Sequence, residues 1–409
     1  MEEPIVVGID VGTTKICTLI AKAGGHNQVH VLGFGLEPSQ GIRKGVVVDL
    51  MAASQAITHS VEKAERTSGL EVNSALVSLA GSHISYVNSK GVVGVSSSII
   101  DQHDIARAVE SARAIAIPHN REIIHVIQRG FSIDGQEGIR MPIGMHGYRL
   151  EVEAHIITAS QATVENLRQC LGEAGIHVSQ FVLNPLASGE SVLTETERQM
   201  GVVVCDIGGG TTDIAIYIDG DVWHTAVLSV GGDLVTSDIA HGLRLPTQQA
   251  EEIKKQYGYA VQSEVRPDEH FTIQPFGDDK MAQISRADLA FIIEARMEEI
   301  MAMILKEIKR SGYDGLLPAG IVFTGGASAL PGIRSLANRV LELPARIAQP
   351  ENMIGMVDKL QSPAFSTSIG LIRWALLMNE FMAPPERRRP QYTDDIWVKV
   401  KEFLIRFLP

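Results

Sequence analysis

Cysteine is scarce in this sequence, with three residues in 409. That number excludes the disulfide framework on which small secreted proteins depend. Cys17 and Cys205 lie within apolar runs, which favours small buried core residues over reactive thiols. A reducing compartment is therefore expected.

Long apolar runs are missing as well. No uninterrupted stretch reaches the roughly 18 residues of a membrane-spanning helix. The first three residues include two glutamates, where a signal peptide would be basic. Basic charge is also in deficit, with 36 Lys and Arg against 48 Asp and Glu, a formal charge of −12. This balance disfavours nucleic acid as a partner, and we expect a cytosolic chain.

What is present is ordinary globular composition, with 45% hydrophobic and 21% charged residues. At about 150 residues per domain, the length predicts two or three domains. An internal repeat divides the chain. Residues 5–20 and 201–218 each read as a β run, an Asp, a Gly/Thr turn and a second β run. Two such halves predict a duplicated α/β architecture with a cleft between them.

The two turns suit a nucleoside triphosphate. Turns without β-carbons let backbone N–H groups approach phosphate oxygens, and threonine hydroxyls can donate to the same oxygens. The predicted phosphate-binding residues are Asp10, Gly12, Thr13, Thr14, Lys15, Gly208, Gly209, Gly210, Thr211 and Thr212. Aspartates would repel phosphate, so we expect a hydrated Mg²⁺ between the phosphates and the carboxylates of Asp10, Asp206 and Asp213. No residue is assigned as the catalytic base.

Later segments complete the predicted ATP site. Small residues after the β run at 320–324 would let a purine or ribose lie on the backbone. Glu251 could accept hydrogen bonds from ribose hydroxyls, and Lys254 could flank the base. The additional candidates are Gly232, Glu251, Lys254, Lys255, Gly325, Gly326, Ala327 and Ser328. Taken alone, the charged segment 251–255 also fits a solvated helix face.

The order of these motifs resembles that of the actin, sugar-kinase and heat-shock-chaperone ATPases. Within that superfamily, residues 142–158 and 184–197 are similar to signatures of the FtsA family of bacterial cell-division proteins. The resemblance implies an α/β actin-like ATPase fold, with two RNase H-like lobes around a nucleotide cleft. It also implies that an FtsA-type inserted subdomain IC replaces actin subdomain IB. In the chaperone relatives a Glu precedes the Pro of the connecting segment, whereas this sequence has Asn184. Asn cannot act as a base, so we expect weak or absent ATP hydrolysis.

The expected subdomains follow from the repeat, the insertion and the resemblance. They are IA (1–84 and 163–200), IC (85–162), IIA (201–228 and 307–383) and IIB (229–306), then a linker (384–393) and a terminal helix (394–409). Within IC we expect a helix over 101–115 and strands over 122–128 and 150–158. Helices are also expected over 247–257 and 285–310. His155 lies in a β run and is expected to be a core residue, since the histidines lack metal-ligand spacing.

The C-terminal segment predicts a membrane-binding helix. Its apolar face opposes Lys399, Glu402 and Arg406, as in an interfacial helix. Residues 384–409 carry six basic and four acidic side chains, which suits an anionic leaflet. The membrane residues are Ile396, Trp397, Val400, Phe403, Leu404, Phe407 and Leu408.

The resemblance implies a peripheral protein on the cytoplasmic side of the membrane at the division septum. It would polymerise with itself, bind the FtsZ C-terminal tail and help recruit other divisome proteins. The acidic, hydrophobic tail would meet Arg286 and Arg296, although both could equally be ion-paired or solvated. A type IV pilus-assembly actin-like ATPase is the alternative, and a small-molecule kinase of the superfamily is a third reading.

Overall fold

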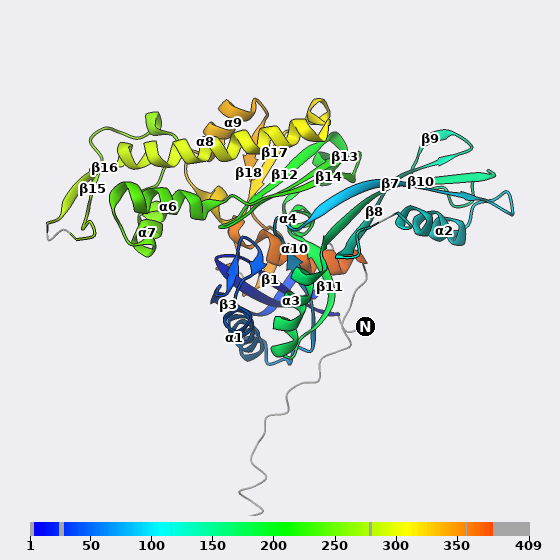
Figure 1. Ribbon diagram of the computed structural model, residues 1–409, viewed down its shortest axis with the longest axis horizontal. Helices are drawn as coiled ribbons and strands as arrows, with labels where there is room; N and C mark the ends of the chain where they lie inside the picture. Colours follow the sequence, from blue (N-terminus) through cyan, green and yellow to red (C-terminus); the bar gives the residue numbers. More distant parts are fainter. Residues whose placement is uncertain (1–3, 24–27, 116, 278–279, 357, 379–409) are drawn as a thin grey trace, which may run out of the picture.

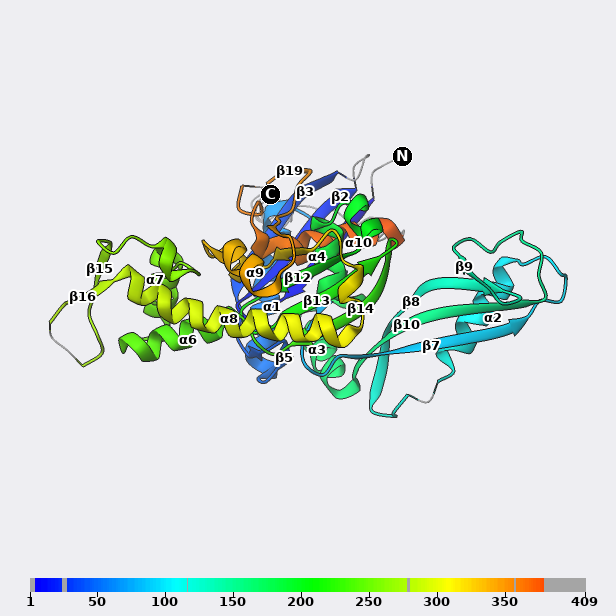
Figure 2. The same ribbon diagram turned by 90° about the horizontal axis from the view of Figure 1, so that it is seen from above.

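A computed structural model describes residues 4–23, 28–115, 117–277, 280–356 and 358–378. Two lobes, each built around a sheet, lie one above the other in Figure 1, and two smaller parts extend to either side. The same parts are seen from above in Figure 2, with α7 (Thr247–Tyr257) at one end and β7 (Ser85–Gly94) at the other. Among the described residues, every helix is too short or too polar to cross a bilayer.

The first lobe contains a six-stranded sheet in the order β11-β6-β1-β2-β3-β19. β1 and β2 form an antiparallel hairpin, and β1 also pairs in parallel with β6. Helices α1 (Leu50–Ser68) and α3 (Gln161–Glu173) pack on this lobe, and a short hairpin, β4 (Ile42–Arg43) and β5 (Val46–Val47), follows β3. The strands are β1 (Ile5–Val11), β2 (Lys15–Ala23), β3 (Val29–Pro38), β6 (Ser74–Leu79), β11 (His177–Leu183) and β19 (Met353–Gly355).

The second lobe repeats this plan in the order β14-β13-β12-β17-β18. β12 and β13 form the equivalent hairpin, and β12 pairs in parallel with β17. The strands are β12 (Val202–Ile207), β13 (Thr212–Ile218), β14 (Asp221–Leu228), β17 (Ile321–Thr324) and β18 (Ala345–Ile347). The predicted duplication is thus confirmed. Cys17 and Cys205 are fully buried in the first and second hairpins, as expected for core residues.

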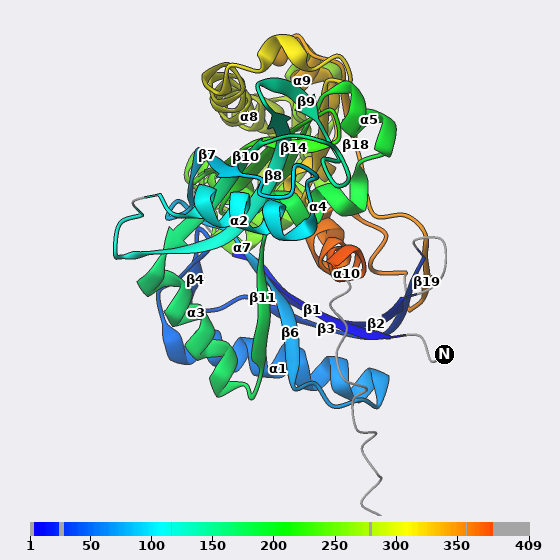
Figure 3. The same ribbon diagram turned by 90° about the vertical axis from the view of Figure 1, so that its right-hand side faces the viewer.

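Helices α4 (Asn184–Val192) and α10 (Ser366–Met378) lie between the lobes (Figure 3). α10 packs on β1 of the first lobe, and α4 packs on β12 of the second. The two helices approach closely, because a β-carbon on Gly370 would come within 1.8 Å of the Ala187 carbonyl oxygen. A short helix, α5 (Glu195–Met200), leads from α4 into β12.

The insertion after β6 forms its own four-stranded sheet in the order β7-β10-β8-β9, with α2 (Gln102–Arg113) beside it. Its strands are β7 (Ser85–Gly94), β8 (Arg121–Ile133), β9 (Gln136–Ile139) and β10 (Arg149–Ser160). The helix and strands predicted in this region are confirmed. A capping box at Asp101 starts α2, and a β-carbon on Gly91 would come within 1.9 Å of the Ala108 carbonyl oxygen. Gly91 thus allows α2 to lie close to the sheet.

The insertion leaves the first lobe but also contacts the second. The guanidinium of Arg129 lies 4.3 Å from the Trp223 ring centre and donates to the Tyr313 hydroxyl. His155 is fully buried, and its ring nitrogens contact Asn88 at 2.7 Å and Thr225 at 3.0 Å. His155 is therefore a satisfied core histidine, as predicted.

A buried glutamate, Glu307, lies beside this contact. His224 meets the Glu307 carboxylate at 2.9 Å, and Arg310 also donates to Glu307. The Tyr86 ring of the insertion lies 4.9 Å from the His224 ring. Although burial alone would raise the pKa of Glu307, hydrogen bonds from His224 and Arg310 lower it to about 2.

The remaining elements form the other end of the molecule, in residues 232–312. They are α6 (Gly232–Leu243), α7 (Thr247–Tyr257), β15 (His270–Ile273), β16 (Ala282–Ser285) and α8 (Arg286–Ser311), with α9 (Ile333–Leu341) packed on α8. α7 and α8 confirm the helices predicted there. Residues 379–409, which include the predicted linker and membrane helix, lie outside the described part of the chain.

Candidate functional site

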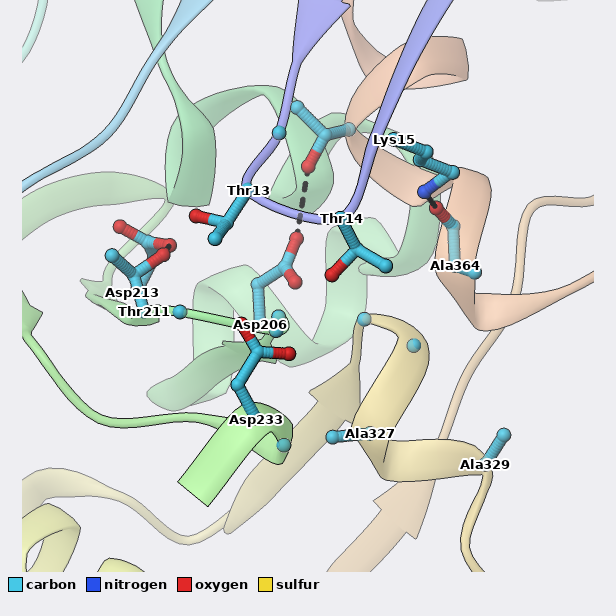
Figure 4. A pocket seen from close by; sticks show the side chains of 18 of the residues that line it. Thr13, Thr14, Lys15, Asp206, Thr211, Asp213, Asp233, Ala327, Ala329 and Ala364 are labelled. Carbon is cyan, nitrogen blue, oxygen red and sulfur yellow. Dashed lines mark hydrogen bonds between the residues drawn. The ribbon is translucent and has the colours of Figure 1, made fainter. Parts of the chain in front are cut away.

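A cavity of about 380 Å³ lies where the two hairpin turns meet (Figure 4). Cavities of a few hundred cubic ångströms are typical of small-molecule sites. Most of the predicted site residues line it: Asp10, Gly12, Thr13, Thr14, Lys15, Asp206, Gly208, Gly209, Gly210, Thr211, Asp213, Gly232, Glu251, Lys254, Lys255, Gly325, Gly326 and Ala327. Thr212 and Ser328 do not. Their hydroxyls donate to the carbonyls of Val230 and Gly325 within the second lobe.

The two turns approach each other so closely that side chains would not fit between them. A β-carbon on Gly209 would lie 2.1 Å from the Thr14 hydroxyl oxygen, and one on Gly210 would lie 2.7 Å from the Thr13 hydroxyl oxygen. These turns come from different lobes. Their glycines therefore set how closely the lobes can approach around a ligand.

The other end of the cavity is formed by residues that follow β17. Gly325 has φ +85°, and a β-carbon there would lie 2.2 Å from Asp206 Oδ1. Only glycine suits this conformation and this approach. A β-carbon on Gly232, in the first turn of α6, would lie 3.1 Å from Ala327 Cβ. Small residues thus give the cavity a smooth backbone wall at the end predicted to hold a nucleoside.

Hydroxyl groups donate hydrogen bonds to Asp10 and Asp206, the next-to-last residues of β1 and β12. Asp10 accepts hydrogen bonds from Ser78 at 3.0 Å and from Ser368 at 2.8 Å. Asp206 accepts one from Thr367 at 2.9 Å. Since Thr367 and Ser368 are neighbours in α10, one helix end orients a carboxylate from each lobe.

The carboxylates of the second lobe are poorly solvated. Burial raises the pKa of Asp206 to about 6, against the hydrogen bond from Thr367. Burial, followed by the nearby Asp206 charge, raises the pKa of Asp213 well above its usual range. Asp213 Oδ2 accepts from Thr211, whereas Oδ1 is buried without a partner in the described structure. Such carboxylates favour a cation between them.

No group of three carboxylate, imidazole or thiol side chains is close enough to hold a metal alone within the described ranges. The expected hydrated Mg²⁺ beside Asp10, Asp206 and Asp213 therefore stays a prediction, because such an ion needs water and phosphate ligands as well. The orphaned oxygen of Asp213 still fits a hydrated Mg²⁺, because that ion keeps several waters and takes its other ligands from phosphates.

The cationic side chains that line the cavity are already partnered. Lys15 donates to the Ala364 carbonyl and lies 4.7 Å from the Phe365 ring centre. Lys254 pairs with Glu251 at 2.6 Å and donates to the Gly232 carbonyl at 3.0 Å. Despite its burial, Glu251 has a lowered pKa because of Lys254. The 251–255 segment is thus part of the cavity wall and not only a solvated helix face.

Three polar residues of the wall, Asp233, Thr367 and Asn184, were not among the predicted ligands. Asp233, in the first turn of α6, lines the cavity, and burial raises its pKa. The Gly231-Gly232 pair that precedes it was the available signal. Thr367 also lines the cavity, and no local pattern marks it. Asn184 lines the cavity as well, and its side-chain oxygen has no partner among the described groups.

The predicted partner-binding arginines lie away from this cavity, on α8. Arg286 pairs with Glu269, and Arg296 pairs with Asp238 at 2.5 Å and with Glu299 at 2.5 Å. Both are ion-paired within the fold, which was the alternative considered for them. Their role toward a partner stays a prediction.

The sequence is similar to that of a known protein family. A model of the family described as "Cell division protein FtsA" matches residues 203–370, and a model of an SHS2 domain inserted in FtsA matches residues 81–158. The chain is similar to proteins named cell division protein FtsA. The Pseudomonas aeruginosa protein is 40% identical over 91% of this chain and 89% of its own length. The Borreliella burgdorferi protein is 41% identical over 91% of each chain.

Solved structures resemble the fold at low identity. A PilM–PilN type IV pilus biogenesis complex gives a TM-score of 0.64 at 18% identity, over 90% of this chain and 97% of that chain. MreB5 of Spiroplasma citri bound to ADP gives 0.57 at 15% identity, over 92% and 98%. These likenesses show the fold alone, which is that of the actin-like ATPases, as predicted.

Proposed function

This chain belongs to the FtsA family of cell-division proteins, and from that premise we propose how it acts. It binds ATP between its lobes, assembles into filaments at the cytoplasmic membrane and attaches the FtsZ ring there. Recruitment of later divisome proteins would follow from that position at the septum.

The main support for nucleotide binding is that two glycine-threonine turns, one from each lobe, line the same cavity. The turns would hold the triphosphate through backbone N–H groups and threonine hydroxyls. The segment after β17 and α7 would hold the nucleoside. Bound Mg²⁺ would neutralise charge between the phosphates and Asp10, Asp206 and Asp213, through water where the carboxylates are too far apart. An MreB relative of the same fold was crystallised with ADP, which supports a nucleotide here.

Isothermal titration calorimetry of the full chain with Mg·ATP tests this step. We expect saturable heat with one nucleotide per chain, and weaker binding when EDTA removes the metal. Absence of heat at millimolar nucleotide would overturn the proposal.

Slow turnover is expected because Asn184 stands where related ATPases place a glutamate. An amide can orient water but cannot accept its proton. Steady-state phosphate release should therefore be far below the roughly 10 s⁻¹ that is typical of enzymes. A rate of that size would show that another group acts as the base.

Membrane attachment would come from the amphipathic segment 394–409. One short interfacial helix binds weakly, whereas many helices on one filament bind together. Flotation with anionic liposomes tests this attachment. The Trp397→Glu, Phe403→Glu variant should stay in the dense fraction. The control variant Gln391→Glu, Thr393→Glu adds the same charge outside the apolar face and should float like the wild type. Equal flotation of all three proteins would contradict the assignment.

The FtsZ tail would bind near the start of α8. The same end of the molecule exposes Phe276, Met281 and Phe291, with exposed fractions of 81%, 63% and 60%. Exposed apolar side chains at the same end of the molecule as Arg286 and Arg296 suit an acidic, hydrophobic peptide. Anisotropy of a labelled FtsZ tail peptide should show weaker binding to Phe291→Ser, with Met141→Ser on the distant insertion as control.

A pilus-assembly role is the second candidate, because the PilM–PilN complex shares the fold. The much higher identity to the FtsA relatives favours cell division. Co-sedimentation with FtsZ polymers separates the two roles, since a pilus protein would not sediment with them.

A further inference from the structure

The short hairpin β4–β5 meets the phosphate turns of both lobes. The amide of Gly45 donates to the Thr13 hydroxyl at 3.2 Å, and Gly45 lines the cavity. A β-carbon on Gly210 would lie 3.1 Å from the Lys44 Cα. The two-residue turn of this hairpin therefore lies where the first-lobe and second-lobe turns come together.

Lys44 occupies this turn in an unusual conformation. Its φ is +50° and that of Gly45 is +74°, so both central residues are left-handed. Such turns strongly prefer Asn-Gly, Asp-Gly or Gly-Gly. A lysine in a left-handed position is uncommon, and strained residues cluster at functional sites.

The charge of the cavity leaves a need for another cation. Three ammonium groups line it, and each of these lysines is already partnered within the wall. A triphosphate adds about four negative charges, of which one Mg²⁺ balances two. Lys44 is exposed, and no described residue pairs with its ammonium group.

We propose that Lys44 binds the terminal phosphate of the nucleoside triphosphate and so lets the hairpin distinguish a triphosphate from a diphosphate. The lysine stem is long and flexible, so its ammonium can reach a phosphate held between the two turns. The backbone of the hairpin touches both lobes, so this contact would link the terminal phosphate to the relative position of the lobes. The inference rests on the proposed binding of ATP in this cavity.

Calorimetry of the full-length variants with Mg·ATP and Mg·ADP tests the inference. Lys44→Gly removes the ammonium while keeping, or easing, the left-handed turn. We expect its affinity for ATP to fall about tenfold, as for loss of one charge-assisted hydrogen bond. Its affinity for ADP should stay within about twofold of wild type, because the terminal phosphate is absent.

Two further variants separate the local contact from general effects. Lys44→Arg should retain most of the ATP affinity. Arg43→Ala removes a neighbouring exposed charge from the same hairpin and should change neither affinity. Unchanged ATP binding by Lys44→Gly, or an equal loss for ATP and ADP, would overturn the inference while leaving nucleotide binding intact. Failure of the wild type to bind ATP would instead overturn the proposed function, and the inference with it.

Discussion

Replacement of Gly209 by alanine tests whether the lobes must come together to bind nucleotide. The new β-carbon would lie 2.1 Å from the Thr14 hydroxyl oxygen and 2.9 Å from Asp233 Oδ1. Ordinary contact begins near 3.4 Å, so the two turns must separate by about an ångström or the side chains must turn away. Misplacement of contact groups by about 1 Å can cost about 100-fold in function.

We therefore expect Gly209→Ala to weaken Mg·ATP binding by about 30- to 100-fold, or about 2–3 kcal/mol. Calorimetry gives this value directly. The fold should remain intact, because the nearest obstacles are side-chain atoms outside the hairpin. Gly172→Ala is the matched control, since a β-carbon at this helical glycine meets nothing within 4 Å. Its ATP affinity should be unchanged, and its stability should rise by about 0.5–1 kcal/mol.

Wild-type ATP affinity in Gly209→Ala, with a normal melting temperature, would refute this reasoning. It would mean that the turns do not approach each other in the bound state. Equal weakening by Gly172→Ala would point to a general effect of substitution instead.

Three further predictions concern the packing around the site. Arg129→Ala should lower the free energy of unfolding by about 1–2 kcal/mol, because the cation–π contact with Trp223 is lost; an unchanged denaturation midpoint would contradict this. Glu307→Gln should be less stable than wild type at pH 7 by about 1–3 kcal/mol. The pKa of Glu307 is lowered from 4.5 to about 2 in the folded state, so this difference should shrink as pH falls through that range. A difference that stays constant from pH 6 to pH 3 would show that ionisation of Glu307 does not contribute. Cys17 and Cys205 should not react with a thiol reagent in the native protein, because burial raises their thiol pKa values; rapid labelling before unfolding would contradict their placement.

The sequence predicted the two hairpins and the cavity between them because each turn is encoded locally. A β run, an aspartate and a glycine-threonine turn occur in both halves, and their repetition identifies the architecture. The helix over 247–257 was also predicted at its observed bounds, because the helical spacing of its residues is a local feature of the sequence.

Other features depend on distant parts of the chain and left no local pattern. Thr367 reaches Asp206 across 161 positions in the sequence. Arg296 finds Asp238 across 58 positions, so its ion pair was not distinguishable from a free cationic side chain. Thr211 precedes β13 and donates to Asp213, whereas Thr212 is the first residue of that strand and donates to the Val230 carbonyl. The sequence grouped both with the phosphate ligands, although only Thr211 lines the cavity.

A crystal structure of the chain with Mg²⁺ and a non-hydrolysable ATP analogue tests the central claim most directly. The claim predicts triphosphate oxygens in contact with backbone amides of both residues 12–14 and residues 208–211, with the metal on the side of Asp213. A nucleotide bound elsewhere, or phosphates that contact the turn of one lobe only, would contradict it.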